Sequence, residues 1–414
     1  MKKSLIALAV LAASGAAMAQ SSVTLFGVVD ATVRYVDGGT NGNIWSLTNS
    51  GYNSSRLGFR GTEDLGGGLS ASFWLEAGVN NDNGTGSASS TNNTVAGSAS
   101  ANTGTQGLTF NRRSTVSLAG SWGELRLGRD FTPYFWNTTI FDPFGTNGVG
   151  AVSNFTLVGL GLLTGNSLNS TAAGVRASNS IGYFMPNISG FYGQAMYAMG
   201  EQNNKLAGGA SNPNGSNGNV GSVRIGYANG PVDIAYSWGA TTWAPSLQYQ
   251  VNNVGASWNF GVAKALFLWN QEASDTPASG TVRSNTYMIG ATMPLGAGEL
   301  KGSYTWGNST NDGVDGSQIA LGYVYNLSKR TALYTTYSYI NNDGKTASYN
   351  MGINPGLGKQ HLRFRLRCEA LLLIPGWPCA SCESNGLKTA NLRIGGFFLP
   401  SLAAALWNRR DGRA

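Results

Sequence analysis

Histidine and cysteine are absent from most of this chain. The 414 residues include one histidine and three cysteines, and all four lie after residue 360, at His361, Cys368, Cys379 and Cys382. Zinc sites, thiol nucleophiles and Ser-His-Asp triads need one of these side chains, so residues 20–360 cannot form an enzyme of these classes. The Cys379/Cys382 pair lacks the second pair that a zinc site needs. We expect a protein that is not an enzyme and holds no cofactor and no metal.

Charged residues are also scarce, at 11% of the chain against about 25% in ordinary globular domains. The net charge is +7, but residues 20–360 carry seventeen basic and seventeen acidic side chains and are neutral. The excess comes from two lysines in residues 1–19 and from eight basic against three acidic residues in 361–414. A nucleic-acid footprint needs clustered positive charge on the folded body, so we expect no nucleic-acid partner.

Long hydrophobic runs are missing as well. No stretch reaches the roughly 20 apolar residues that a spanning helix needs. The apolar run from Leu5 to Ala13 is shorter, follows Lys2 and Lys3, and precedes Ala17-Met18-Ala19. This is the pattern of a secretory signal peptide at residues 1–19. We therefore expect an exported protein.

Glycine and aromatic residues, in contrast, are plentiful, with 59 glycines and 11% aromatics. They occur in segments of about ten residues in which apolar and polar side chains alternate, as in a strand with one face in lipid and one in water. In the first segment, Leu25 and Val33 alternate with Thr32 and Arg34. The alternation predicts fifteen strands, near residues 23–35, 52–61, 68–79, 108–119, 122–130, 175–184, 189–199, 220–229, 231–240, 247–260, 261–271, 283–294, 298–308, 315–327 and 330–341.

The connections between these strands alternate in length. Gly120-Ser121 and Ser328-Lys329 are tight turns, whereas 80–107, 131–174 and 200–219 are long. Short turns at one end and long loops at the other are typical of an outer-membrane barrel. A soluble β-sandwich or propeller gives no reason for this pattern. The predicted fold class is all-β, a transmembrane antiparallel β-barrel over residues 20–360, with 16 strands because barrels of this kind have an even number.

Several motifs resemble those of the Gram-negative trimeric general porins, in particular the anion-preferring ones. They are Ser22-Val-Thr-Leu-Phe-Gly-Val-Val-Asp30, Ser55-Arg-Leu-Gly-Phe-Arg-Gly-Thr-Glu-Asp-Leu-Gly-Gly-Gly-Leu69, Asn111-Arg-Arg-Ser-Thr-Val-Ser-Leu118, Gly123-Glu-Leu-Arg-Leu-Gly-Arg-Asp130 and Leu321-Gly-Tyr-Val-Tyr-Asn-Leu-Ser-Lys-Arg330. The resemblance implies a third loop, here Phe131 to about Gly174, that folds into the pore. We expect its Phe-Asp-Pro-Phe segment to pack on the inner wall with Asp142 facing water. The alternative is a loop that caps the surface of the assembly.

Strand alternation also predicts which arginines face the lumen. If Leu57 and Phe59 face lipid, then Arg56 and Arg60 face inward. The same reasoning places Arg34, Arg113 and Arg176 inside. In the resembling family, the positions of Arg56, Arg113 and Arg176 form an arginine ladder opposite the third loop, which implies anion preference. Alternatively, these arginines pair with loop carboxylates such as Asp142 and fix the loop.

The resemblance implies a general diffusion porin in the cell outer membrane, a homotrimer in contact with outer-membrane lipid that passes small anions and hydrophilic solutes. The competing hypothesis is an outer-membrane adhesin or receptor barrel with a plugged lumen.

Residues 361–414 do not continue the strand pattern. The expected last strand, a segment ending in Phe, is missing, and the tail reads Arg-, Leu-, Cys- and Trp-rich. A frameshift near residue 360 would explain the change, because allowed codons for residues 361–374, shifted by one base, encode an alternating strand ending in Phe and a stop. A frameshifted, non-functional porin is then a further alternative. We expect residues 361–368, which alternate briefly, to substitute in part for the missing strand beside the first one.

Overall fold

The computed structural model describes residues 22–38, 42–87, 89, 93, 107–156, 174–201, 215–244, 247–276, 280–309, 315–343, 349 and 369–371. All of them belong to one compact unit, residues 1–379. The predicted signal peptide at residues 1–19 and most of the tail at 361–414 lie outside the described residues, so these two predictions remain open.

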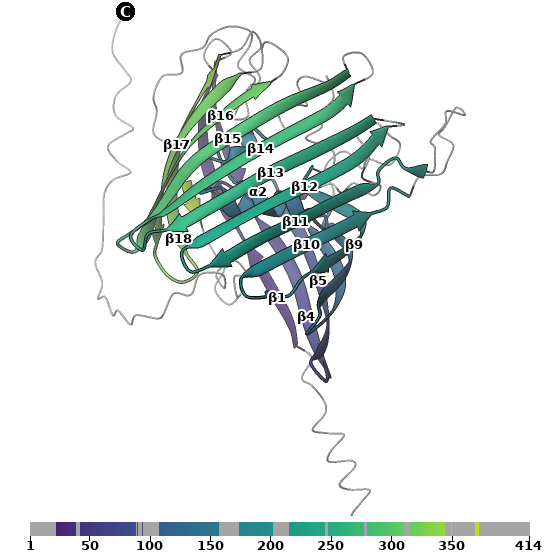
Figure 1. Cartoon of the computed structure of the whole chain (residues 1–414). Helices are drawn as coiled ribbons and strands as arrows, with labels where there is room; N and C mark the ends of the chain where they lie inside the picture. Colours follow the sequence, from purple (N-terminus) through teal and green to yellow (C-terminus); the bar gives the residue numbers. More distant parts are fainter. Residues whose placement is uncertain are drawn as a thin grey trace, which may run out of the picture. The chain divides into compact units, whose positions relative to one another are not determined.

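The described residues form one antiparallel sheet of tilted strands (Figure 1). Its strands are β1 (Ser22–Val28), β2 (Asp30–Asp37), β3 (Asn43–Asn49), β4 (Arg56–Gly66), β5 (Leu69–Asn80), β6 (Thr85–Gly86), β7 (Arg113–Gly120), β8 (Gly123–Phe131), β9 (Arg176–Phe184), β10 (Phe191–Ala198), β11 (Val220–Asn229), β12 (Val232–Ala244), β13 (Leu247–Asn259), β14 (Lys264–Thr276), β15 (Gly280–Leu295), β16 (Gly298–Ser309), β17 (Gly316–Asn326), β18 (Ala332–Asn342) and β19 (Glu369–Leu371). All fifteen predicted strands are present.

Neighbouring strands in the sequence are mostly neighbours in the sheet. β1 and β2 are two parts of one strand, and they pair with β4 and β3 respectively. Counting β1–β2 and β3–β4 as one strand each, and leaving out the two-residue β6, the described sheet has sixteen strands. This number agrees with the sixteen predicted.

The strand predicted at 52–61 is interrupted. Residues 50–55 leave the sheet between β3 and β4. The backbone N–H groups of Tyr52 and Asn53 donate instead to the Asp30 carboxylate, at 2.8 and 2.7 Å. The Asp30 side chain on β2 therefore accepts these two N–H groups in place of the backbone carbonyls of a neighbouring strand.

The two faces alternate as predicted. On β7 and β9, the large apolar residues Val116 and Ile181 are 58% and 44% exposed, whereas Thr115 and Ser180 are 4% exposed. An apolar outer face suits lipid and a polar inner face suits water. Among the described residues, no helix is long and apolar enough to cross a membrane.

The shortest element, β19, lies between the last and first strands. It pairs with β18 through Ala370 and Glu369, and with β2 through all three of its residues. Residues 369–371 of the tail thus connect the last long strand, β18, with β2 of the first strand. The stretch 361–368, predicted to do this, lies outside the described residues, and the strand that is described begins at Glu369.

A group of side chains also joins β18 to β2, and we call Asp30, Thr32 and Tyr334 the seam clasp. The Tyr334 hydroxyl hydrogen-bonds with the Asp30 carboxylate and the Thr32 hydroxyl, and all three residues are buried. Tyr334 pairs with Glu369, which pairs with Thr32. The Tyr334 side chain therefore reaches across β19, so the seam is held by side chains as well as by backbone.

The long segment after β8 contains a helix, α2 (Pro133–Phe141), and a short 3₁₀ turn at Val152–Asn154. The sequence pattern did not predict this helix. It lies against β10–β14 (Figure 1), so the described part of the third loop is folded into the barrel.

Candidate functional site

The third loop is seated on glycines of the inner wall. A Cβ atom added to Gly255 would lie 1.9 Å from the ring of Phe141, and one added to Gly239 would lie 2.4 Å from the ring of Tyr134. Further along the loop, a Cβ atom added to Gly290 would lie 2.5 Å from the ring of Pro143. Real Cβ atoms do not approach so closely, so this path of the loop requires residues without side chains on the strands beneath it.

Polar contacts fix the helix along the same path. Asn137 donates to the Ala235 carbonyl oxygen at 3.2 Å and to the Asn253 side-chain oxygen at 2.8 Å. Its own side-chain oxygen accepts from Nε of Arg224 at 2.9 Å. Asn253 in turn donates to the carbonyl oxygen of Tyr134 at 3.0 Å. Because Arg224, Ala235 and Asn253 lie on β11, β12 and β13, three strands hold one turn of α2.

Asp142 organises the loop after the helix. Its carboxylate accepts the backbone N–H groups of Phe144, Thr146 and Val152, at 2.9, 2.9 and 3.0 Å. The prediction that Asp142 faces water is wrong, since the residue is 5% exposed. Burial raises the pKa of this carboxyl above its usual range, and the three N–H donors oppose that shift because they favour the ionised form.

Residues 147 and 148 of the loop meet the segment between β3 and β4. The Ser54 hydroxyl donates to the side-chain oxygen of Asn147 at 2.7 Å. Gly148 has a φ of +68°, and a Cβ there would lie 2.0 Å from the Gly51 carbonyl oxygen. The loop therefore runs from β8 along the inner wall to the segment between β3 and β4.

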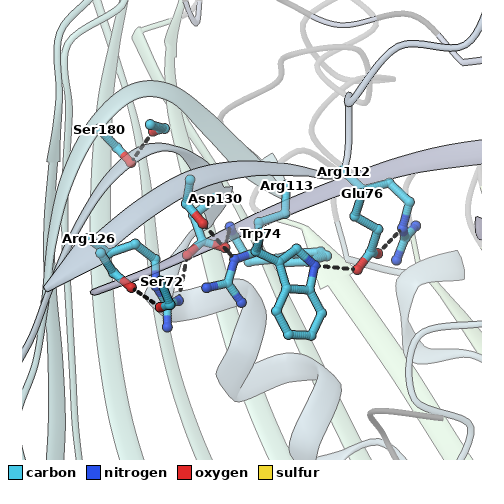
Figure 2. Close-up of polar contacts among 12 residues, drawn as sticks. Ser72, Trp74, Glu76, Arg112, Arg113, Arg126, Asp130 and Ser180 are labelled. Carbon is cyan, nitrogen blue, oxygen red and sulfur yellow. Dashed lines mark hydrogen bonds and ion pairs between the residues drawn. The ribbon is translucent and has the colours of Figure 1, made fainter. Parts of the chain in front are cut away.

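The strands β4 to β9, against which helix α2 does not lie, carry a group of arginines and carboxylates (Figure 2). Glu76 forms ion pairs with Arg112, at 2.5 Å, and Arg56, at 3.7 Å. Asp130 pairs with Arg126 at 2.6 Å and with Arg113 at 3.8 Å. Arg126 also donates twice to Glu124, at 3.0 and 2.9 Å. Among the described residues, the ion pairs of these arginines are thus with carboxylates of the wall. None of them involves Asp142, with which the alternative hypothesis paired the arginines.

Several arginines of this wall also lie on aromatic rings. The guanidinium carbon of Arg60 is 5.2 Å from the centroid of Trp74, and that of Arg113 is 4.6 Å from the same ring. The guanidinium carbon of Arg176 lies 4.3 Å from the centroid of the Phe131 ring. Stacking of a planar guanidinium on an aromatic face is favourable and leaves its N–H edges open.

Six arginines lie on strands β4 to β9, and Arg112 directly precedes β7. We call these seven residues the arginine wall: Arg56, Arg60, Arg112, Arg113, Arg126, Arg129 and Arg176. Three carboxylates, Glu76, Glu124 and Asp130, lie among them. The wall therefore carries four positive charges in excess. Arg34, also predicted to face the lumen, lies on β2, which pairs with β3 and β19, and so is not in this group.

Sequence reasoning did not select four arginines of the site: Arg112, Arg126, Arg129 and Arg224. Alternation alone would have placed Arg126 on the inner face together with Asp130. Alternation puts Arg129 on the lipid face with Leu127, where an arginine costs about 2–4 kcal/mol. The structure has a register shift between Gly128 and Asp130, and Arg129 donates to the Asn111 carbonyl and the Ser178 hydroxyl, at 2.6 and 2.7 Å.

Known proteins resemble this chain over most of its length. The family model described as Gram-negative porin matches residues 5–345. Outer membrane porin protein 32 of Delftia acidovorans is 42% identical over 347 residues, which cover 83% of this chain and 90% of that protein. An outer membrane porin protein of Bordetella pertussis is 31% identical over 415 residues, covering 85% of this chain and 99% of that protein. The solved anion-selective porin from Comamonas acidovorans matches with a TM-score of 0.69 and 35% identity, covering 85% of this chain and 98% of that one. The chain belongs to the Gram-negative porin family.

Proposed function

We propose that this porin passes small hydrophilic solutes and ions passively across the outer membrane, prefers anions, and owes that preference to Arg56, Arg113 and Arg176. The observation that carries the proposal is the excess of four positive charges on the arginine wall, opposite a loop whose carboxylate, Asp142, is buried. The positive charge of the wall is therefore not offset from the loop side by that residue.

The physical basis is the position of fixed charge beside a narrow aqueous path. Charges at a low-dielectric wall focus the electric field and raise the local concentration of ions of opposite sign. Arginine suits this role because its guanidinium remains ionised and binds carboxylate or phosphate groups with two N–H donors. Small anions, carboxylates and phosphates are the favoured solutes.

The test replaces the three arginines together by alanine and measures the reversal potential of the reconstituted protein in a KCl gradient. We expect the chloride-to-potassium permeability ratio to fall severalfold, and Arg330→Ala, in the exposed turn before β18, to leave it unchanged. An unchanged ratio in the triple variant would show that these residues do not set the preference.

The adhesin or receptor hypothesis predicts a plugged lumen and therefore little single-channel current in the same membranes. Steady open-channel conductance would reject it. We further propose that the protein assembles as the homotrimer that its family resemblance implies.

A further inference from the structure

Phe131, the last residue of β8, contacts both the arginine wall and the third loop. Its ring lies 4.3 Å from the guanidinium carbon of Arg176, its partner across the ladder, and 5.8 Å from that of Arg112. On the loop side, its ring is parallel to that of Phe135, at 5.7 Å and 9°, and 5.3 Å from Trp136. One ring thus joins a wall cation to α2.

Arg176 differs from four other arginines of the wall in what holds it. Arg56, Arg112, Arg113 and Arg126 each have a carboxylate within 4 Å. Within the described part of the chain, Arg176 has no ion pair, and its buried Nε has no hydrogen-bond partner. Its charge is repelled by those of Arg112 and Arg129 and attracted by those of Glu76 and Asp130. The contact that the structure shows for its side chain is the face of Phe131.

We propose that Phe131 is a positioning residue for anion preference: its ring holds the Arg176 guanidinium in place, so that this charge stays uncompensated and available to a passing anion. This inference rests on the proposed role of the arginine wall. An arginine side chain has several rotatable bonds, and without the ring it is free to turn toward Glu76 or Asp130. An ion pair there would neutralise the charge without removing the residue.

Phe131→Leu and Phe131→Tyr test this role. Leucine keeps an apolar side chain but has no π face, whereas tyrosine keeps the face. Since Phe131→Leu removes the aromatic face on which the guanidinium is stacked, we expect it to lower the chloride-to-potassium permeability ratio by about twofold. We expect Phe131→Tyr to retain the ratio.

Two matched variants separate positioning from general damage. Phe184 lies 3.8 Å beneath Arg126, but Glu124 and Asp130 also bind that arginine, so Phe184→Leu should leave the ratio unchanged. Phe135→Leu removes the loop side of the stack and keeps the contact between Phe131 and Arg176. It should alter conductance or current noise more than the permeability ratio.

The outcomes are distinguishable with Arg176→Ala as reference. If Arg176→Ala lowers the ratio and Phe131→Leu does not, the positioning role is wrong and the proposed function stands. If neither lowers it, the role of Arg176 in the proposed function is wrong as well. A loss in Phe131→Tyr or Phe135→Leu equal to that in Phe131→Leu would mean that loop displacement is the cause, which also overturns the positioning role.

Discussion

At the scale of single residues, Asp142 carries the largest share of the loop's internal hydrogen bonding among the residues described above. We expect Asp142→Ala to release the loop from the wall, because three buried N–H groups lose their acceptor at once. A buried donor left without a partner costs about 1–3 kcal/mol. Single-channel recording should show larger or noisier currents.

Glu63→Ala, at an exposed position on β4, is the control for Asp142→Ala and should leave the current trace unchanged. A quiet channel of unaltered conductance in Asp142→Ala would show that the loop holds its place without this carboxylate.

The inward arginines could be predicted from the sequence where the strand is regular. Arg56 and Arg113 follow simple alternation. In the structure Arg56 forms an ion pair with Glu76, and Arg113 forms one with Asp130. Arg129 could not be placed, because a register shift breaks the alternation next to it. The burial of Asp142 could not be predicted either. The backbone N–H groups that donate to its carboxylate lie two to ten residues further along the loop, and no periodic pattern reveals such contacts.

At the scale of secondary structure, the strands could be predicted and α2 could not. Alternation is a local property of each strand, so fifteen strands follow from short windows of sequence. The segment Pro133–Phe141 has few charged residues and no repeating polar face. Its helix depends on Gly239, Gly255 and Asn253, which lie more than a hundred residues away in the chain.

Gly255→Ala tests this dependence of α2 on the wall. The added methyl group would overlap the Phe141 ring, so we expect the helix to move toward the lumen and single-channel conductance to fall. Gly221→Ala is the matched control, since a Cβ at that position meets no atom closer than 4.0 Å. Equal conductance in both variants would mean that the ring moves aside without displacing the helix.

At the scale of the whole barrel, the seam between β18 and β2 passes through β19, of which the structure describes three residues. The seam clasp adds buried hydrogen bonds across this seam. Much of the stability of the seam therefore depends on Tyr334.

We expect Tyr334→Phe to weaken the seam, because the Asp30 carboxylate and the Thr32 hydroxyl both lose a buried partner. The expected loss is about 1–3 kcal/mol, seen as a lower temperature of unfolding by circular dichroism in detergent. Tyr325→Phe, at a 44% exposed position on β17, should leave that temperature unchanged. An equal temperature in Tyr334→Phe would show that backbone pairing alone closes the seam.

The path of the third loop separates two properties of the channel. Its seat is built from glycines on β12, β13 and β15, and the cations stand on β4 to β9. If the wall arginines set the ion preference as proposed, the width of the opening and the sign of the preferred ion depend on different halves of the barrel. Exchanging wall residues should then change the preferred ion while the opening keeps its width.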